Sequence, residues 1–243
     1  MFRGGNESFR MKPSLVSCIV PVFNGERYLG EALESILAQT YRPIEIIVID
    51  DGSTDTTPKV AACYEERIRY VRQDNAGAPS ARNLGLSLSS GEFVAFLDAD
   101  DLWRAEKLER QMRRFDVRPE LELCVTYLQN FWIAELKAEE NRFKGHRLSE
   151  PVPGYVTQTL LARRTAFDRV GMFDASLQVG DPTDWFLRAG ERGLVTELLT
   201  DVLVNRRMHD NNMSMQAGTR RMTPEMQDSM LHVVKASLDR RRN

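Results

Sequence analysis

The sequence lacks most of the features that assign a chain to a class without further argument. Its 243 residues include only three cysteines, and Cys18, Cys63 and Cys124 are isolated from one another. This number and spacing exclude a disulfide framework and a cysteine-based zinc site. Reduced, isolated cysteines are typical of cytoplasmic proteins, so we expect a cytoplasmic location.

Long apolar runs and a strong net charge are absent as well. No apolar stretch approaches the roughly 20 residues that cross a bilayer, and residues 1–12 contain no signal-peptide core. The net charge of −2 argues against nucleic acid as a partner. A polyanionic ligand would therefore need local neutralisation by arginines or a metal ion. A peripheral contact with an anionic surface is still an alternative, through Arg240, Arg241 and Arg242.

Up to about residue 101, the sequence contains a repeated alternation of apolar strands and amphipathic helices. Strand patterns occur at 15–22, 44–49, 68–72 and 93–97, and helix patterns at 28–37, 55–66 and 78–89. This alternation predicts an α/β fold of Rossmann-like type, with a mostly parallel central sheet flanked by helices.

The pattern after Leu102 is less regular. It predicts helices at 107–115, 165–170, 184–192 and 224–241, strands at 121–132, 194–199 and 202–206, and a polar loop at 137–153. We expect one domain over residues 1–243, in which residues 14–101 form a nucleotide-binding half. The irregular half at 102–243, with its C-terminal helix, then completes the pocket.

Three carboxylates follow directly after the apolar run that ends at residue 97. Asp98 and Asp100 are two residues apart, so on a continuing strand they would point the same way. Ligands bind at the carboxyl ends of such strands, and a cation would relieve the repulsion between the two acids. The pattern favours a Mg²⁺ or Mn²⁺ site. The alternative is that Asp100 or Asp101 caps a helix that begins near Leu102.

Other polar segments reach the same edge of the predicted sheet. Residues 21–24 follow the first strand and Asp51 follows the second, although a turn would explain either one alone. Gly77 permits close approach of a phosphate to a helix start. Arg82, one turn later, suits a diphosphate or an acid beside the metal. The alternative for Arg82 is a surface ion pair.

Five segments in order resemble the family 2 glycosyltransferases of the GT-A fold. They are residues 16–24, 35–40, 49–55, 81–85 and 96–101. The resemblance is close from Val16 to about Leu108 and continues weakly to about Ser214. It implies an inverting transfer of sugar from a nucleotide-diphosphate donor, a UDP-sugar in first place, to an acceptor hydroxyl, with Mn²⁺ or Mg²⁺ on the diphosphate.

The resemblance also implies roles for individual residues. Asp98 and Asp100 match the DXD motif as metal ligands, with Asp100 the more direct one. His209 lies in a later segment that closes over the phosphates and is a candidate metal ligand or phosphate contact. Asp51 matches the acid that binds the base. The residues expected to bind the nucleotide are Pro21, Phe23, Asn24, Asp51, Gly77, Arg82 and Asp98.

The general base is where the sequence departs from the family. Members usually carry Glu-Asp, followed two residues later by a second Asp, but this chain reads Asp181-Pro182-Thr183-Asp184. Pro182 occupies the place of the base and cannot take a proton. Asp181 is therefore the first candidate base and Asp184 the second, whereas helix capping is the competing explanation for Asp181. The alternative function is a nucleotide-sugar-binding protein with weak or lost catalysis.

Two further interpretations concern other enzyme classes and the tryptophans. A dinucleotide oxidoreductase or a nucleotidyltransferase is disfavoured, because residues 21–25 contain neither Gly-x-Gly-x-x-Gly nor a Walker lysine. Trp103, Trp132 and Trp185 are more typical of core residues than of sugar-stacking ones. Trp185 is the best stacking candidate of the three, because it adjoins the proposed base.

Overall fold

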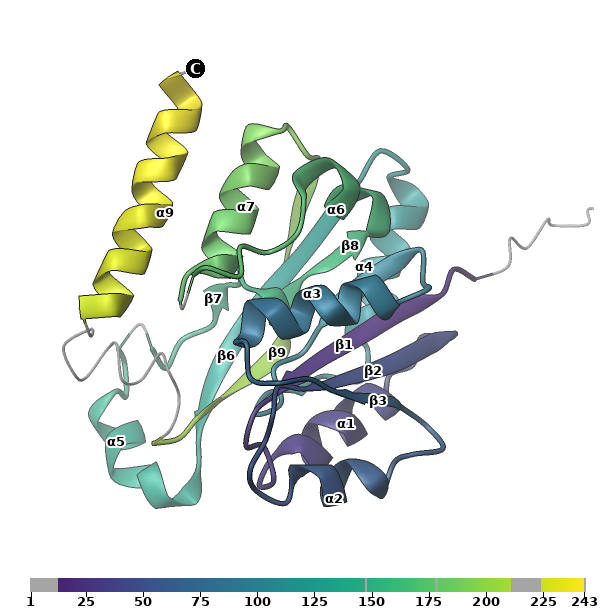
Figure 1. Cartoon of the computed structure of the whole chain (residues 1–243), viewed down its shortest axis with the longest axis vertical. Helices are drawn as coiled ribbons and strands as arrows, with labels where there is room; N and C mark the ends of the chain where they lie inside the picture. The colour runs from purple at the N-terminus through teal and green to yellow at the C-terminus, as the bar shows by residue number, and fades with distance from the viewer. Residues whose placement is uncertain (1–12, 147, 178, 211–223, 243) are drawn as a thin grey trace, which may run out of the picture.

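The computed structural model describes residues 13–146, 148–177, 179–210 and 224–242. Within them, one nine-stranded sheet has the order β3-β2-β1-β4-β8-β6-β9-β5, with β7 paired to β6 (Figure 1). The strands are β1 (Val16–Val22), β2 (Ile44–Asp50), β3 (Arg69–Arg72), β4 (Phe93–Phe96), β5 (Leu102–Trp103), β6 (Leu123–Trp132), β7 (Val152–Pro153), β8 (Leu161–Arg163) and β9 (Thr196–Met208). The helices are α1 (Leu29–Leu37), α2 (Thr57–Ala62), α3 (Ala78–Leu88), α4 (Lys107–Val117), α5 (Lys137–Arg142), α6 (Arg164–Val170), α7 (Asp181–Glu191) and α9 (Pro224–Arg242), with 3-10 turns η1 (Ala134–Leu136) and η2 (Thr157–Thr159).

Six of the nine strands in the described sheet run in the same direction. β3, β2, β1 and β4 pair in parallel, as do β6 and β9. Only β5, β7 and β8 run antiparallel to their partners. The predicted fold class, a mostly parallel α/β sheet flanked by helices, is therefore confirmed. The carboxyl ends of β1, β2 and β4 reach the same edge.

Each face of the sheet has its own layer of helices. Every residue of β1 is buried, and Val16, Cys18, Val20 and Val22 face a cluster that includes residues of α1, α2 and α4. Ile19 faces the opposite cluster, to which α3, α6 and α7 contribute. Because alternate strand residues point to opposite faces, burial on both explains the continuous apolar run.

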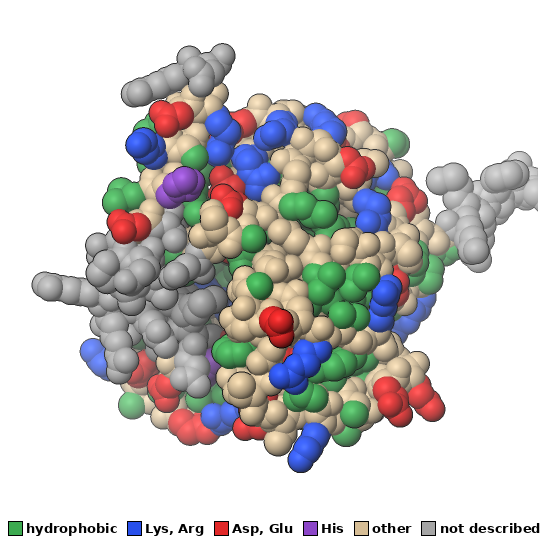
Figure 2. All heavy atoms as spheres, in the orientation of Figure 1, with side chains coloured by type: hydrophobic (Ala, Val, Ile, Leu, Met, Phe, Trp, Pro, Cys, Tyr) green, Lys and Arg blue, Asp and Glu red, His purple; other side chains and the backbone are tan. Residues whose placement is uncertain are grey.

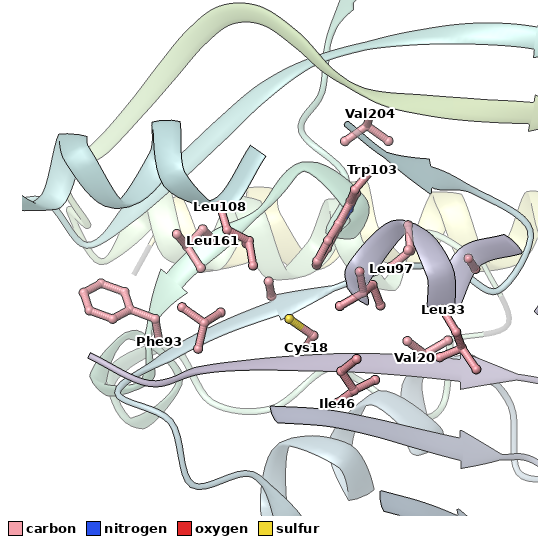
Figure 3. Close-up of a cluster of buried hydrophobic side chains, with 14 of the residues drawn as sticks. Cys18, Val20, Leu33, Ile46, Phe93, Leu97, Trp103, Leu108, Leu161 and Val204 are labelled. Carbon is pink, nitrogen blue, oxygen red and sulfur yellow. The ribbon is translucent and has the colours of Figure 1, made fainter. Parts of the chain in front are cut away.

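The core on the α1 side encloses a lysine. Figure 3 shows Trp103 in this cluster between Val204 of β9 and Leu97. Lys107 is fully buried, and its Nζ lies 4.2 Å from the centroid of the Trp103 ring and donates to Gln111 Oε1 at 2.8 Å. Burial lowers the pKa of Lys107 to about 7.

The close approach of α3 to the sheet depends on a glycine. A β-carbon on Gly85 would lie 2.4 Å from Ile19 Cγ2 and 3.3 Å from Ile49 Cγ1. Any larger residue would push the helix outward. This contact fixes the height of Arg82, one turn nearer the start of α3, over the sheet edge.

Three predictions of local structure are wrong. The expected polar loop at 137–153 contains α5 and β7, because Lys137–Arg142 consists mostly of good helix formers without apolar periodicity. The expected strands at 194–199 and 202–206 are one strand, β9, since a register shift opposite Thr126 and Tyr127 absorbs the intervening residues. The last helix before β9 starts at Asp181, not at Asp184.

The surface carries both signs of charge. On the face shown in Figure 2, acidic and basic side chains are interspersed. α9 packs against α7, where Ser237 Oγ and Arg240 Nε donate to the Glu191 carboxylate at 2.7 and 2.6 Å. Within the described ranges, no helix combines the length and apolarity needed to cross a membrane.

Candidate functional site

A pocket of about 1120 Å³ lies at the carboxyl edge of the sheet. The loops after β1, β2 and β4 line it, together with the start of α3, η2 and the end of β9. Nine predicted site residues line this pocket, namely Pro21, Phe23, Asn24, Asp51, Gly77, Arg82, Asp98, Asp100 and His209. Asp181 and Asp184 are not among the lining residues. A drug-sized ligand typically occupies a pocket of roughly 300–1,000 Å³, so a nucleotide sugar would fit.

The loop after β1 combines an exposed ring with a fixed turn. The Phe23 side chain is 52% exposed and offers an apolar face to the pocket. Asn24 has a φ of 51°, and its Oδ1 accepts a hydrogen bond from Thr54 N at 2.8 Å. Its own N donates to Ser53 Oγ at 2.9 Å. Asn24 therefore ties the loops after β1 and β2 together.

Asp51 holds the loop that leads into α3. Its carboxylate accepts hydrogen bonds from Ala76 N and Gly77 N, both at 2.8 Å, and from Gln73 Nε2 at 2.7 Å. The N–H of Gly77 is thus directed at Asp51, and its φ of +89° suits glycine. The contact of Asp51 with a base and the contact of Gly77 with a phosphate remain predictions.

Arg82 bridges two carboxylates beneath the pocket. Its Nη2 donates to Asp98 Oδ1 at 3.0 Å and its Nη1 to Asp181 Oδ2 at 2.7 Å. Arg82 and Asp181 are 6% and 5% exposed. Burial acts to lower the pKa of Arg82, but the two carboxylates outweigh it and raise the value further. Arg82 is therefore a buried cation in a cluster of acids, not a surface residue.

The same bridge determines the state of Asp181. Burial raises the pKa of this carboxyl, and Arg82 opposes the shift. Asp181 is the first residue of α7, Gly180 is the cap, and no side-chain capping bond forms. The capping explanation for Asp181 is therefore wrong. Its carboxylate Oδ2 accepts a hydrogen bond from Arg82 Nη1.

Asp100 and His209 meet at the other side of the pocket. His209 Nε2 lies 2.9 Å from Asp100 Oδ2, and the imidazole packs 5.0 Å from the Tyr28 ring, centroid to centroid. A carboxylate and an imidazole are ligands that suit Mn²⁺. In the described part of the chain no three acidic, cysteine or histidine side chains form a complete metal site. The donor set therefore fits a metal that takes its remaining ligands from substrate phosphates and water.

Asp101 is not the helix cap that the sequence suggested. Leu102 begins β5 and the next helix begins at Lys107. Asp101 is 2% exposed, and its Oδ1 accepts a hydrogen bond from Arg207 N at 2.9 Å. Burial and the neighbouring carboxylates of Asp100 and Asp98 raise its pKa. Asp101 thus joins the loop after β4 to the end of β9.

Gln158 is a pocket residue that the sequence reasoning missed. Its Nε2 donates to Asp98 Oδ2 at 2.6 Å and to Asp101 Oδ2 at 3.0 Å. It lies in η2, where no motif or apolar period marks it. Only the antiparallel return of β8 beside β4 brings η2 to these acids.

Asp184 and Trp185 lie away from the pocket. The Asp184 carboxylate accepts hydrogen bonds from Arg188 Nε at 2.7 Å and Arg240 Nη2 at 3.3 Å. Trp185 is fully buried in the core, with its ring centroid 4.7 Å from that of Phe167. The core position that the sequence favours for Trp185 is therefore confirmed, and the alternative stacking role is wrong. The ion pairs of Asp184 argue against it as a base.

The fold and this arrangement of acids have counterparts among known proteins. The sequence profile described as "Glycosyl transferase family 2" matches residues 17–171. The chain belongs to this family. The resemblance of its five segments is therefore confirmed.

Relatives by sequence carry glycosyltransferase names. An uncharacterized glycosyltransferase of Rickettsia typhi is 33% identical over 207 residues, which cover 81% of this chain and 64% of the relative. Glycosyltransferase GlyA of Streptococcus pneumoniae is 48% identical over 89 residues, 35% of this chain and 13% of that one. The chain thus spans less than two thirds of the length of these relatives.

Solved structures share the GT-A fold. S. aureus TarS 1-349 in complex with UDP-GlcNAc has a TM-score of 0.73 at 19% identity, over 90% of this chain and 65% of that one. The mannosyltransferase PcManGT of Pyrobaculum calidifontis, in complex with GDP-Man and Mn²⁺, has a TM-score of 0.66 at 19% identity, over 93% of this chain and 70% of that one. At these identities the likeness establishes the fold alone.

Proposed function

We propose that the protein is an inverting glycosyltransferase that moves a sugar from a nucleotide-diphosphate donor, a UDP-sugar in first place, to an acceptor hydroxyl. A divalent metal, Mn²⁺ or Mg²⁺, holds the diphosphate. The observation that carries the proposal is the pairing of Asp100 with His209, beside the Arg82–Asp98 ion pair, in one pocket. The ligands of the similar solved structures, UDP-GlcNAc in one and GDP-Man with Mn²⁺ in the other, support it.

Different residues along the pocket have different roles in the proposed reaction. In this proposal Phe23 and Asp51 bind the nucleoside, and Asp100 with His209 holds the metal. When bound, the metal neutralises the negative charge that develops on the leaving diphosphate. Arg82 adds a fixed positive charge beneath the same acids.

Asp181 is the proposed general base. Burial raises its pKa, which favours proton uptake, but its Oδ2 is held by Arg82. To accept a proton from the acceptor hydroxyl, the carboxylate must use its other oxygen or turn away from Arg82. Catalysis therefore uses Oδ1 of Asp181 or requires a local change at the start of α7.

Titration calorimetry with UDP and Mn²⁺ tests the donor site. We expect UDP to bind the wild-type protein with Mn²⁺ and to lose most of its affinity in EDTA or in Asp100→Ala. The matched control is Asp201→Ala, which removes a half-exposed carboxylate of β9 that does not line the pocket. Equal UDP affinity in Asp100→Ala and in the wild type would contradict the metal site.

A second candidate function is nucleotide-sugar binding with weak or lost catalysis. Pro182 at the place of the family's base and the pairing of Asp181 with Arg82 favour it. Donor hydrolysis or transfer that disappears in Asp181→Asn, with UDP binding retained, would support the enzyme. Binding without turnover across a broad acceptor panel would support the binding protein.

A further inference from the structure

We propose that Gln158 is a specificity-determining residue of the donor pocket: its side-chain carbonyl accepts a hydrogen bond from a hydroxyl group of the donor sugar. The inference rests on the proposed function, because it needs a nucleotide sugar in the pocket. It assigns a contact to a residue outside all five segments that carry the family resemblance.

Two carboxylates fix the orientation of the Gln158 amide. Its Nε2 lies 2.6 Å from Asp98 Oδ2 and 3.0 Å from Asp101 Oδ2, so both amide hydrogens have acceptors. Turning the amide by half a rotation would place Oε1 against the Asp98 carboxylate, where two acceptors repel each other. The direction of Oε1 is therefore set by the acids.

The carbonyl oxygen is left for a ligand. Gln158 is 7% exposed and lines the pocket, and across residues 13–210, as far as they are described, no donor bonds to its Oε1. A hydroxyl group can donate to this oxygen, whereas a phosphate oxygen cannot. Because Gln158 Oε1 can only accept a hydrogen bond, it would bind the hydroxyl groups of the sugar and not the diphosphate.

The position of Gln158 also distinguishes the sugar from the base. Phe23 and Asp51 lie at the loops after β1 and β2, which the proposed function assigns to the nucleoside. Gln158 instead contacts Asp98 and Asp101, which flank Asp100. A donor that extends from the first loops past the metal-binding acid brings its sugar, not its base, to Gln158.

The backbone of η2 is held firmly enough for this role. Trp103 Nε1 donates to Gln158 O at 2.8 Å, and Gln111 Nε2 donates to Thr159 O at 2.9 Å. Gln111 is in turn bonded to the buried Lys107. Such support limits the movement of the side chain and sharpens discrimination between sugars.

The test compares deoxygenated donors in the wild-type protein and in Gln158→Met. UDP-glucose, UDP-N-acetylglucosamine and GDP-mannose are first titrated with Mn²⁺, and the tightest binder is then titrated as its series of single deoxy analogues. In the wild type we expect one analogue to bind about fivefold more weakly, the effect of one neutral hydrogen bond. In Gln158→Met the same analogue should bind as tightly as its parent sugar.

Controls separate this contact from folding and from the proposed function. UDP alone should still bind Gln158→Met, and Gln158→Asn, whose shorter side chain withdraws the carbonyl, should behave like Gln158→Met. Gln129→Met makes the same substitution at a half-buried glutamine outside the pocket and should keep every deoxy penalty. Unchanged penalties in Gln158→Met, with UDP still bound, would overturn the role of Gln158 alone. Failure of UDP and GDP to bind the wild type would overturn the proposed function.

Discussion

Arg82 is the residue on which the charge balance of the site depends. It is the buried cation that pairs with both Asp98 and Asp181. Removing one partner of such a cluster is costly, because the remaining charges stay buried without compensation. The network should therefore appear as strong non-additivity between substitutions.

We predict that Arg82→Met destabilises the protein by about 3 kcal/mol, since two acids lose their counter-charge. Adding Asp181→Asn should restore part of this loss, because a neutral amide costs less to bury than a carboxylate. Urea unfolding of the wild type, both single variants and the double variant measures the coupling. If the two substitutions changed the free energy of unfolding by strictly additive amounts, the ion pair between Arg82 and Asp181 would be contradicted.

The matched control for the comparison of the Arg82 and Asp181 variants is Arg67→Met. Arg67 is 49% exposed by its side chain and pairs with Glu34 at 3.7 Å. An exposed pair of this kind contributes at most about 1 kcal/mol. Its loss should therefore be small and insensitive to Asp181→Asn.

Lys107 gives a prediction for the dependence of stability on pH. Its pKa is lowered from 10.5 to about 7 in the folded protein, so between these values the unfolded state binds more protons. Stability should therefore rise with pH from 7 to 8.5, by up to about 1 kcal/mol per unit from this group. Above that range the buried thiols oppose the trend, because burial raises the pKa of Cys18 and Cys124 to about 12.

Denaturant unfolding at pH 7, 7.5, 8 and 8.5 measures this slope. In Lys107→Met the rise should be lost, because no group is left to release its proton on folding. Lys59→Met, at an exposed position of α2, should retain the slope of the wild type. A slope that survives in Lys107→Met would show that another group is responsible.

The residues that line the pocket could be predicted from the sequence, but most of their hydrogen-bond and ion-pair partners could not. Acids and glycines that follow strands lie at one edge by topology alone, so Asp51, Asp98 and Asp100 could be grouped from their positions in the chain. The pairing of Arg82 with Asp181 joins residues 99 positions apart. No local pattern encodes such a contact. The same holds for Gln158, whose position depends on the path of the chain between β7 and β8.

At the scale of elements, α3 positions Arg82 through its contact with the sheet. We predict that Gly85→Ala destabilises the protein by about 1–3 kcal/mol, because the added methyl group would meet Ile19 Cγ2 at 2.4 Å. The outward shift of α3 should also weaken UDP binding. Thermal unfolding and calorimetry measure the two effects.

Gly190→Ala is the matched control, since Gly190 also lies in a helix. A β-carbon there meets nothing within 4 Å. Alanine has the higher helix propensity, so this variant should gain about 0.5–1 kcal/mol. If both variants were equally stable, close packing of α3 would not be the reason for Gly85.

The elements themselves were predictable where apolar periodicity was strong. The N-terminal strands and helices follow their patterns because both faces of β1, β2 and β4 are buried. Residues 137–153 have no apolar period to reveal α5, and the break expected within β9 is absorbed by an irregularity in its pairing with β6. Elements whose form depends on tertiary pairing could not be deduced locally.

For the whole molecule, the essential property is that the site is shared between distant parts of the chain. Asp100 and His209 are 109 positions apart, and Arg207 and Asp101 are 106 apart. β9, which carries Arg207 and leads to His209, pairs with β6 and β5, not with β2 and β4, the strands that precede Asp51 and Asp98. A ligand bound between Asp100 and His209 should therefore stabilise both parts together.

We predict that UDP with Mn²⁺ slows amide hydrogen exchange in two separate regions, the loops at 50–54 and 75–78 and the end of β9 at 204–209. Each ligand contact adds binding energy only in the closed, folded arrangement, so local opening of both regions becomes rarer. At a ligand concentration of 100 times Kd, protection should rise by up to about 2.7 kcal/mol. UDP in EDTA should protect the first region more than the second, because the base contacts do not need the metal. Protection confined to residues 50–78 even with Mn²⁺ would mean that His209 takes no part in holding the diphosphate.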